Sequence, residues 1–196
     1  MSQLSSAGML LINSLGSLVL LVVVLRFLLQ LVRADFYNPI SQFVVKATSP
    51  ILVPLRRFIP GYGGIDIASL LLAYIIQVVI IALIFLVSSQ PIMPWANFFL
   101  WAPVGLLSLL LNIYFWGLII IVIASWIAPN SYNPALILVN QILEPAIRPI
   151  RRIMPDLGGI DLSPIVLFLA IRMSEILVVT PIAVSLGVPR GLFFGL

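Results

Sequence analysis

The segment PLRRFIPGYGGID (residues 54–66) recurs 95 residues later as PIRRIMPDLGGID (149–161). Eight of the thirteen positions are identical: two prolines, two arginines, the Gly-Gly pair, an isoleucine and an aspartate. At the same offset and without a gap, thirteen of thirty positions are identical between 37–66 and 132–161. The chain therefore contains an internal repeat that is longer than this motif. We call 37–66 the first elbow and 132–161 the second elbow.

Outside the elbows the chain is mostly apolar. Hydrophobic residues make up 62% of the 196 residues and charged residues only 8%, against about 45–50% and about 25% in soluble domains. So few polar side chains cannot cover a surface that faces water. Lipid must therefore surround most of the chain, and we expect an integral membrane protein.

Four apolar runs reach the roughly 20 residues that a helix needs to cross a bilayer. We place them at 9–32, 67–87, 103–127 and 163–187. The first run is too long for the apolar core of a signal peptide, and no basic residue precedes it, which favours a retained helix. The predicted fold class is an all-α membrane protein with four transmembrane helices.

Each repeat consists of a transmembrane helix, an elbow and a second transmembrane helix. The first repeat covers 8–87, an outer connection covers 88–102, and the second repeat covers 103–187. Because each unit crosses the membrane twice, both copies insert the same way round. The two tandem repeats are therefore parallel rather than inverted.

Positive charge is concentrated in the elbows, whereas residues 1–8 and 88–102 carry no charge. By the positive-inside rule, we expect both elbows in the cytoplasm and both termini on the periplasmic side. Arg190, near the C-terminus, is the one cation that does not fit this distribution. The cations that set the prediction are Arg33, Lys46, Arg56, Arg57, Arg148, Arg151 and Arg152.

Each elbow begins with a typical helix start, Asn38-Pro39 or Asn133-Pro134. An apolar stripe of Ile40, Phe43, Val44 and Ala47 predicts a short amphipathic helix on the membrane surface. Two prolines in each elbow are then expected to stop regular helix. They are Pro50 and Pro54 in the first elbow, and Pro145 and Pro149 in the second.

The second half of each elbow combines arginines, a turn and a helix cap. Guanidinium groups in the headgroup layer can bind lipid phosphates or a protein partner. The Gly-Gly pair permits a sharp turn, and the aspartate that follows can cap the next transmembrane helix. The candidate binding residues are Arg56, Arg57, Arg148, Arg151 and Arg152, and the turn and cap residues are Gly63, Gly64, Asp66, Gly158, Gly159 and Asp161.

Arg172 and Glu175 lie one helical turn apart within the fourth apolar run. Arg172 is about 15 Å along the helix from Asp161, which places it near mid-bilayer. We expect Arg26 of the first run to reach the same carboxylate. Gln77 occupies the position equivalent to Arg172 in the first repeat, so we expect these four residues to share a polar interior. They serve either as contacts between helices or as a permeation or ligand site.

Several classes of function are excluded by composition. The chain has no cysteine and no histidine, which rules out disulfides, thiolate metal sites and imidazole chemistry. There is no phosphate-binding glycine loop and no nucleophile with an adjacent base. Ten cations against six carboxylates is too small an excess to indicate nucleic acid. We expect a protein that is not an enzyme and binds no cofactor.

The doubled pattern P-x-R-R-x-x-P-x-x-G-G-I-D resembles that of the YggT family, also called YlmG, over roughly residues 8–187. The resemblance implies a small protein of the bacterial inner membrane. It also implies links with tolerance of osmotic shock, potassium uptake, cell-division gene clusters and membrane-protein or cytochrome assembly. The family supplies no catalytic residues to carry over.

Two functions follow as expectations. The first is a non-enzymatic protein that supports osmotic-stress tolerance or potassium homeostasis, with its polar interior as the working element. The alternative is a scaffold whose elbows recruit cell-division or membrane-protein assembly partners. Anionic lipid headgroups and further copies of the chain are the other expected partners, and nucleic acid is not one.

Overall fold

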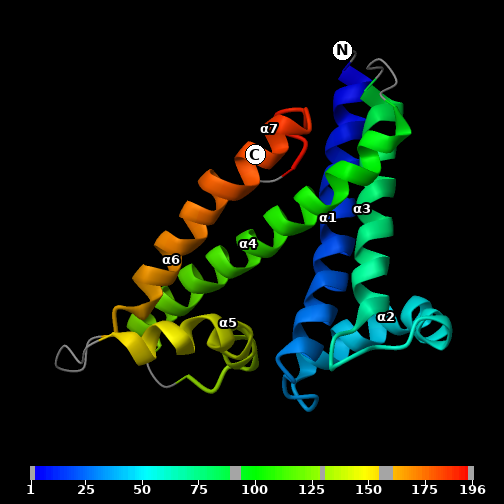
Figure 1. The fold of residues 1–196 in the computed structure, drawn as a ribbon. Helices are drawn as coiled ribbons and strands as arrows, with labels where there is room; N and C mark the ends of the chain where they lie inside the picture. The colour runs from blue at the N-terminus through cyan, green and yellow to red at the C-terminus, as the bar shows by residue number, and fades with distance from the viewer. Residues whose placement is uncertain (1–2, 89–93, 129–130, 155–160, 194–196) are drawn as a thin grey trace.

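The computed structural model describes residues 3–88, 94–128, 131–154 and 161–193 (Figure 1). These residues form helices and no strand, with one isolated bridge between Tyr62 and Ile65. The all-α prediction is confirmed, and four helical stretches are long and apolar enough to cross a membrane. They are α1 (Gln3–Leu31), α3 (Ile67–Ser88), α4 (Trp95–Ile127) and the stretch Ser163–Ser185. This last stretch consists of α6 (Ser163–Ser174), a π-helical turn (Glu175–Val179) and α7 (Thr180–Ser185).

The two elbows lie at the same end of the molecule (Figure 1). Each contains one helix that connects two spans, α2 (Pro39–Phe58) or α5 (Pro134–Ile153). In Figure 1, α1 runs beside α3, and α4 crosses from the upper part of α3 to lie along α6. The N-terminus lies at the end opposite the elbows. This arrangement is required if the chain crosses the membrane four times, with one elbow between the first two spans and the other between the last two.

The expectation that the elbow prolines stop the helix is wrong. α2 continues through Pro50 and Pro54, and α5 continues through Pro145 and Pro149. All four prolines lie on the exposed face of their helix. Each proline removes one amide donor, but on this face water or headgroups can bind the carbonyl that is left over. The helix therefore survives at a cost that its apolar packing offsets.

The predicted start of the third span at Pro103 is also wrong, because α4 begins eight residues earlier, at Trp95. Proline inside a helix leaves the carbonyl four residues before it without an amide donor. Here that carbonyl belongs to Phe99, and the Tyr74 hydroxyl of α3 donates a hydrogen bond to it (3.1 Å). The outer connection is thus shorter than the predicted 88–102.

The side of α2 that faces the protein differs from the predicted stripe. Val44 is buried, but Phe43 and Ala47 are exposed. The buried positions are Ser41, Val44, Thr48 and Leu52, which recur every three or four residues. Serine and threonine occupy two of these buried positions because their small side chains allow close contact. The Thr48 hydroxyl donates a hydrogen bond to the carbonyl of Val44 (2.8 Å).

Asn38 joins the two elbows. Its Oδ1 accepts a hydrogen bond from the amide of Ile40 and caps α2 (2.9 Å), while its Nδ2 donates to the carbonyl of Pro134 (2.7 Å). Asn133 caps α5 in the same way through the amide of Ala135 (2.9 Å). Asn38 is buried and Asn133 is exposed. Both residues cap a helix, but Asn38 also links the two elbows.

Replacement of Asn38 by alanine should therefore destabilise the protein more than replacement of Asn133. Both changes remove a helix cap, at about 1 kcal/mol, but only Asn38→Ala also breaks the link to the other elbow, at about 1 kcal/mol more. Thermal unfolding in detergent, followed by circular dichroism, measures the difference. Equal losses for the two variants would contradict the role of Asn38 as a link.

Candidate functional site

The carboxylate of Asp66 is the centre of a buried polar cluster at the elbow end of the first repeat. It forms an ion pair with Arg56 and accepts a hydrogen bond from the Ser69 hydroxyl. The amide of Ser69 also donates to it (3.3 Å), as expected of an aspartate that caps α3. Arg56 in turn donates to Gln30 Oε1 of α1 (2.8 Å). One carboxylate thus connects α1, α2 and the start of α3.

Asp66 stays ionised in this cluster. Burial raises the pKa of its carboxyl, but the hydrogen bonds from Arg56 and Ser69 outweigh burial and hold the pKa below its usual range. Arg26 of α1 lies close enough to interact electrostatically with both Arg56 and Asp66. The prediction that Arg26 reaches Glu175 is therefore wrong. Arg26 lies five residues before the end of α1, near the elbow end of the helix, and helix packing directs it to the carboxylate at the start of α3.

The turn that precedes Asp66 is a tight two-residue hairpin. Tyr62 and Ile65 exchange backbone hydrogen bonds (3.1 and 3.0 Å), and Gly63 and Gly64 between them have φ of 61° and 87°. Positive φ at both central residues is the geometry that glycine adopts without steric cost. The equivalent residues Gly158 and Gly159 lie outside the described residues.

The second repeat contains the same ion pair in an exposed setting. Arg151 contacts Asp161 through Nη2 (3.0 Å) and Nε (3.1 Å), and it also lies 3.6 Å from Glu144. The Asp161 side chain is 42% exposed, whereas that of Asp66 is 1% exposed. Asp161 accepts a hydrogen bond from the amide of Ser163 at the start of α6 (2.9 Å).

Residue differences between the repeats explain this contrast. At the 95-residue offset, Arg26 corresponds to Ile121 and Gln30 to Ser125, so the second repeat lacks the long polar side chains that surround the first pair. Gln30 and Ser69 are functional neighbours of Asp66 that the motif alone does not reveal. Alignment of the first span of each repeat at the 95-residue offset would have indicated Gln30, because this long polar residue corresponds to the small Ser125 in the second repeat.

The remaining elbow cations are exposed. Arg57, Arg148 and Arg152 lie on the outer faces of α2 and α5, together with Lys46. Among the ion pairs of the described residues, none involves these four side chains. They are therefore available to anions outside the chain.

Arg172 and Glu175 form an ion pair within the fourth span (2.6 Å). The guanidinium carbon of Arg172 lies 3.9 Å from the centre of the Phe115 ring of α4, a cation–π contact. The Glu175 side chain is 10% exposed, but that of Arg172 is 43% exposed. This pair is near neither Arg26 nor Gln77, so the predicted common polar interior is divided among three separate places.

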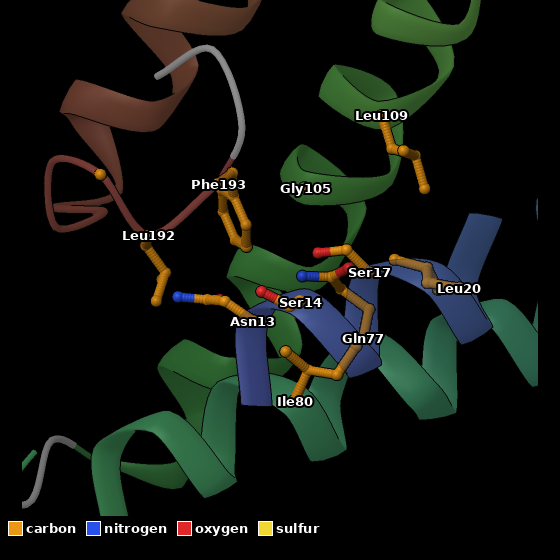
Figure 2. Close-up of a pocket in the computed structure, with 11 residues that line it drawn as sticks. Asn13, Ser14, Ser17, Leu20, Gln77, Ile80, Gly105, Leu109, Leu192 and Phe193 are labelled. Atoms are coloured by element: carbon orange, nitrogen blue, oxygen red, sulfur yellow. The ribbon is translucent and has the colours of Figure 1, made fainter. Parts of the chain in front are cut away.

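Gln77 lines a different feature, a cavity of about 360 Å³ between α1, α3, α4 and the turn after α7. Asn13, Ser14 and Ser17 of α1 bring further neutral polar groups to it (Figure 2). Gly105 of α4 permits the close approach of Gln77, because a Cβ there would lie 2.9 Å from Gln77 Nε2. The ring of Phe193 covers the cavity beside Gly105 in Figure 2.

The helix is widened directly after Glu175. The amide of Thr180 donates to the carbonyl of Glu175, five residues back, and the Thr180 hydroxyl donates to the same oxygen (2.9 Å). Pro181 follows and has no N–H. The carbonyl of Ile176 therefore lacks both the donor of an α-helix and that of a π-helix. Such π-helical turns occur frequently at functional sites.

Comparison with known proteins finds one family model, described as CCB3/YggT, which matches the chain twice, at residues 5–87 and 100–182. The chain is similar to an uncharacterized protein of Pseudomonas aeruginosa, with 51% identity over 193 residues and 98% of each chain covered. It is also 43% identical over 163 residues to the protein YggT of Escherichia coli K12, covering 81% of this chain and 82% of YggT. No solved structure is significantly similar to the chain.

The two ion pairs of the elbows should respond differently to neutralisation. Asp66→Asn should cost about 1.5–3 kcal/mol at pH 7, because it removes a buried charge-assisted contact, whereas the exposed Asp161→Asn should cost about 0–1 kcal/mol. The folded-state pKa of Asp66 is depressed, so its stabilisation is present above the unfolded pKa of about 3.9 and is lost as the pH falls through the folded value. Thermal unfolding in detergent at pH 7 and pH 3 measures both effects. A gap between wild type and Asp66→Asn that does not shrink at pH 3 would contradict this assignment.

Proposed function

The chain belongs to the CCB3/YggT family, and we propose that it is a non-enzymatic scaffold of the bacterial inner membrane. In this proposal both elbows lie on the cytoplasmic surface, where they bind anionic lipid headgroups and a cell-division or membrane-protein assembly partner. Both termini then lie on the periplasmic side. Tolerance of osmotic shock would follow from the integrity of the assembly that the scaffold supports.

The observation that carries this proposal is the set of exposed cations at one end of the molecule. Lys46 and Arg57 of the first elbow and Arg148 and Arg152 of the second make no ion pair within the described parts of the chain. Each cation near an anionic leaflet contributes about 1 kcal/mol of attraction. Four such groups in fixed positions suit a membrane-bound docking platform.

The rigidity of the first elbow supports the same proposal. Arg56, Asp66 and Gln30 tie α2 to both spans of its repeat, and Asn38 ties α2 to α5. A platform that presents charges to a partner needs this kind of fixed base, because every side chain that must be ordered on binding weakens the complex. The second elbow, with its exposed Arg151 and Glu144, is the side better placed for the partner.

A second candidate is a conduit that serves potassium homeostasis. The cavity lined by Asn13, Ser17 and Gln77 favours it, since neutral oxygen-bearing side chains can replace water around a monovalent cation. Against it, the polar residues Arg26, Gln77 and Arg172 lie in three separate places. A conduit would therefore need more than one copy of the chain.

One pair of variants separates the two functions. Arg57→Gln combined with Arg148→Gln and Arg152→Gln removes three of the four exposed elbow cations, and Gln77→Leu removes the amide of the cavity. In a strain without the wild-type gene, we expect the triple variant to fail to restore growth after osmotic upshift and Gln77→Leu to restore it. Potassium flux into liposomes should be at background for wild type and for both variants. Flux in wild type that Gln77→Leu abolishes would favour the conduit instead.

The triple variant requires a control for topology. It keeps Arg33, Lys46, Arg56 and Arg151, so the positive charge that orients the chain is largely retained. Because the natural chain has no cysteine, Tyr132→Cys, which lies at a fully exposed site beside α5, provides a unique label. Labelling from the cytoplasmic side in both backgrounds would show that the loss of growth reflects charge and not inversion.

A further inference from the structure

Gln77 of α3 carries a buried amide that the described chain leaves without a partner. It lies ten residues after Ile67, the start of α3, about 15 Å along the helix and near the middle of a hydrocarbon core of about 30 Å. The residue is 4% exposed, yet within the described parts of the chain its side chain forms no hydrogen bond. A polar group buried without a partner is costly, and most such groups in proteins are paired. The amide therefore calls for a partner from outside.

The cavity beside Gln77 has room for that partner. Its volume of about 360 Å³ falls within the range of about 300–1,000 Å³ that is typical of small-molecule sites. Figure 2 shows the Gln77 amide and the hydroxyls of Ser14 and Ser17 gathered in one region, next to the ring of Phe193. The other side chains that enclose the space are mostly apolar, namely Leu20, Ile80, Leu109 and Leu192.

The lining of this cavity is neutral. Among the described residues that line it, none is ionisable, and the polar ones are Asn13, Ser14, Ser17 and Gln77. A charged group at this depth is strongly disfavoured without a countercharge. Amides and hydroxyls can both donate and accept hydrogen bonds. The lining thus fits an uncharged molecule that has oxygen atoms at one end and an apolar body.

The polar side of the cavity opens toward lipid. Ser14 and Ser17 are exposed on α1, and Ser17 lies fourteen residues before Leu31, the end of α1, about 21 Å along the helix and inside the hydrocarbon core. The apolar neighbours Leu15 and Leu18 are 63% and 58% exposed. A molecule that enters here comes from the lipid phase. Water alone is a poor occupant, because apolar walls give it few partners.

We propose that the cavity binds an uncharged lipid whose head carries hydroxyl or carbonyl oxygens in place of a phosphate. The Gln77 amide and the serine hydroxyls of α1 bond those oxygens, and the tail lies along the apolar surface of α1. Diacylglycerols and membrane quinones share this chemistry. The site goes beyond the scaffold role, because Gln77 lies about 15 Å from the elbow end of α3 and none of the exposed elbow cations takes part.

Photolabelling in phosphatidylcholine liposomes tests the site. The probe is a diacylglycerol with a diazirine near the ester of one acyl chain, and we expect it to label Leu109, Leu192 or Phe193. Dioctanoylglycerol or a benzoquinone with a decyl tail should displace the probe. Displacement by the first alone identifies a glycerolipid and by the second alone a quinone, and either result supports the site. Dioctanoyl phosphatidic acid, which differs from dioctanoylglycerol only by its phosphate, should displace the probe at least tenfold less.

Three results would overturn the proposal. Equal displacement by phosphatidic acid would show that the site does not select an uncharged head. Absence of label in the cavity, or failure of both uncharged competitors, would show that no such lipid binds there. Displacement by potassium chloride but not by choline chloride would assign the cavity to a cation.

Two variants test the polar contacts of the cavity. Gln77→Leu should lower the labelling about fivefold, the loss of one neutral hydrogen bond. Ser17→Leu removes a hydroxyl and narrows the space at an exposed site, so it should lower the labelling while folding is retained. Ser125→Leu, exposed on α4 outside the cavity, is the matched control and should be labelled as wild type. Thermal unfolding followed by circular dichroism checks the fold of each variant. Unchanged labelling of both cavity variants would contradict the assignment.

Discussion

The ion pair between Arg56 and Asp66 is the contact on which the geometry of the first repeat depends. In a bilayer, apolar contact between helices gives little net stabilisation, because lipid tails are as apolar as leucine. The direction of each element is then decided by polar contacts and close packing. Asp66 fixes α2 against α1 and α3, Tyr74 fixes α3 against α4, and the indole N–H of Trp101 fixes α4 to the carbonyl of Leu186 (2.9 Å). A few polar groups therefore position a chain that is otherwise mostly apolar.

The repeat places identical motifs in unlike surroundings. The same arginine and aspartate recur 95 residues apart, yet the first pair is buried and bonded to Gln30, and the second is exposed beside Glu144. The difference arises from the neighbouring spans, which supply polar side chains in one repeat and apolar or small ones in the other. One motif thus makes a structural anchor in the first repeat and an accessible surface in the second.

Hydrophobicity was enough to predict the four spans, and the Asn-Pro pairs were enough to predict the starts of α2 and α5, because both signals depend on residues close in sequence. The helix boundaries at proline were predicted wrongly. Whether a proline ends a helix depends on a donor for the freed carbonyl, and Tyr74 supplies it from another helix. Depth along a span also follows from counting residues, but the direction around the helix does not. For this reason Arg26, Gln77 and Arg172 were predicted to share one polar interior, whereas in the structure they lie in three separate places.

The unequal burial of the two elbow ion pairs has a consequence for which substitutions the chain can accept. A substitution in the first elbow disturbs α1, α2, α3 and, through Asn38, the other repeat. A substitution at Arg151 or Asp161 of the second elbow changes a pair that is exposed. The second elbow is the half in which new surface chemistry can arise while the first preserves the fold.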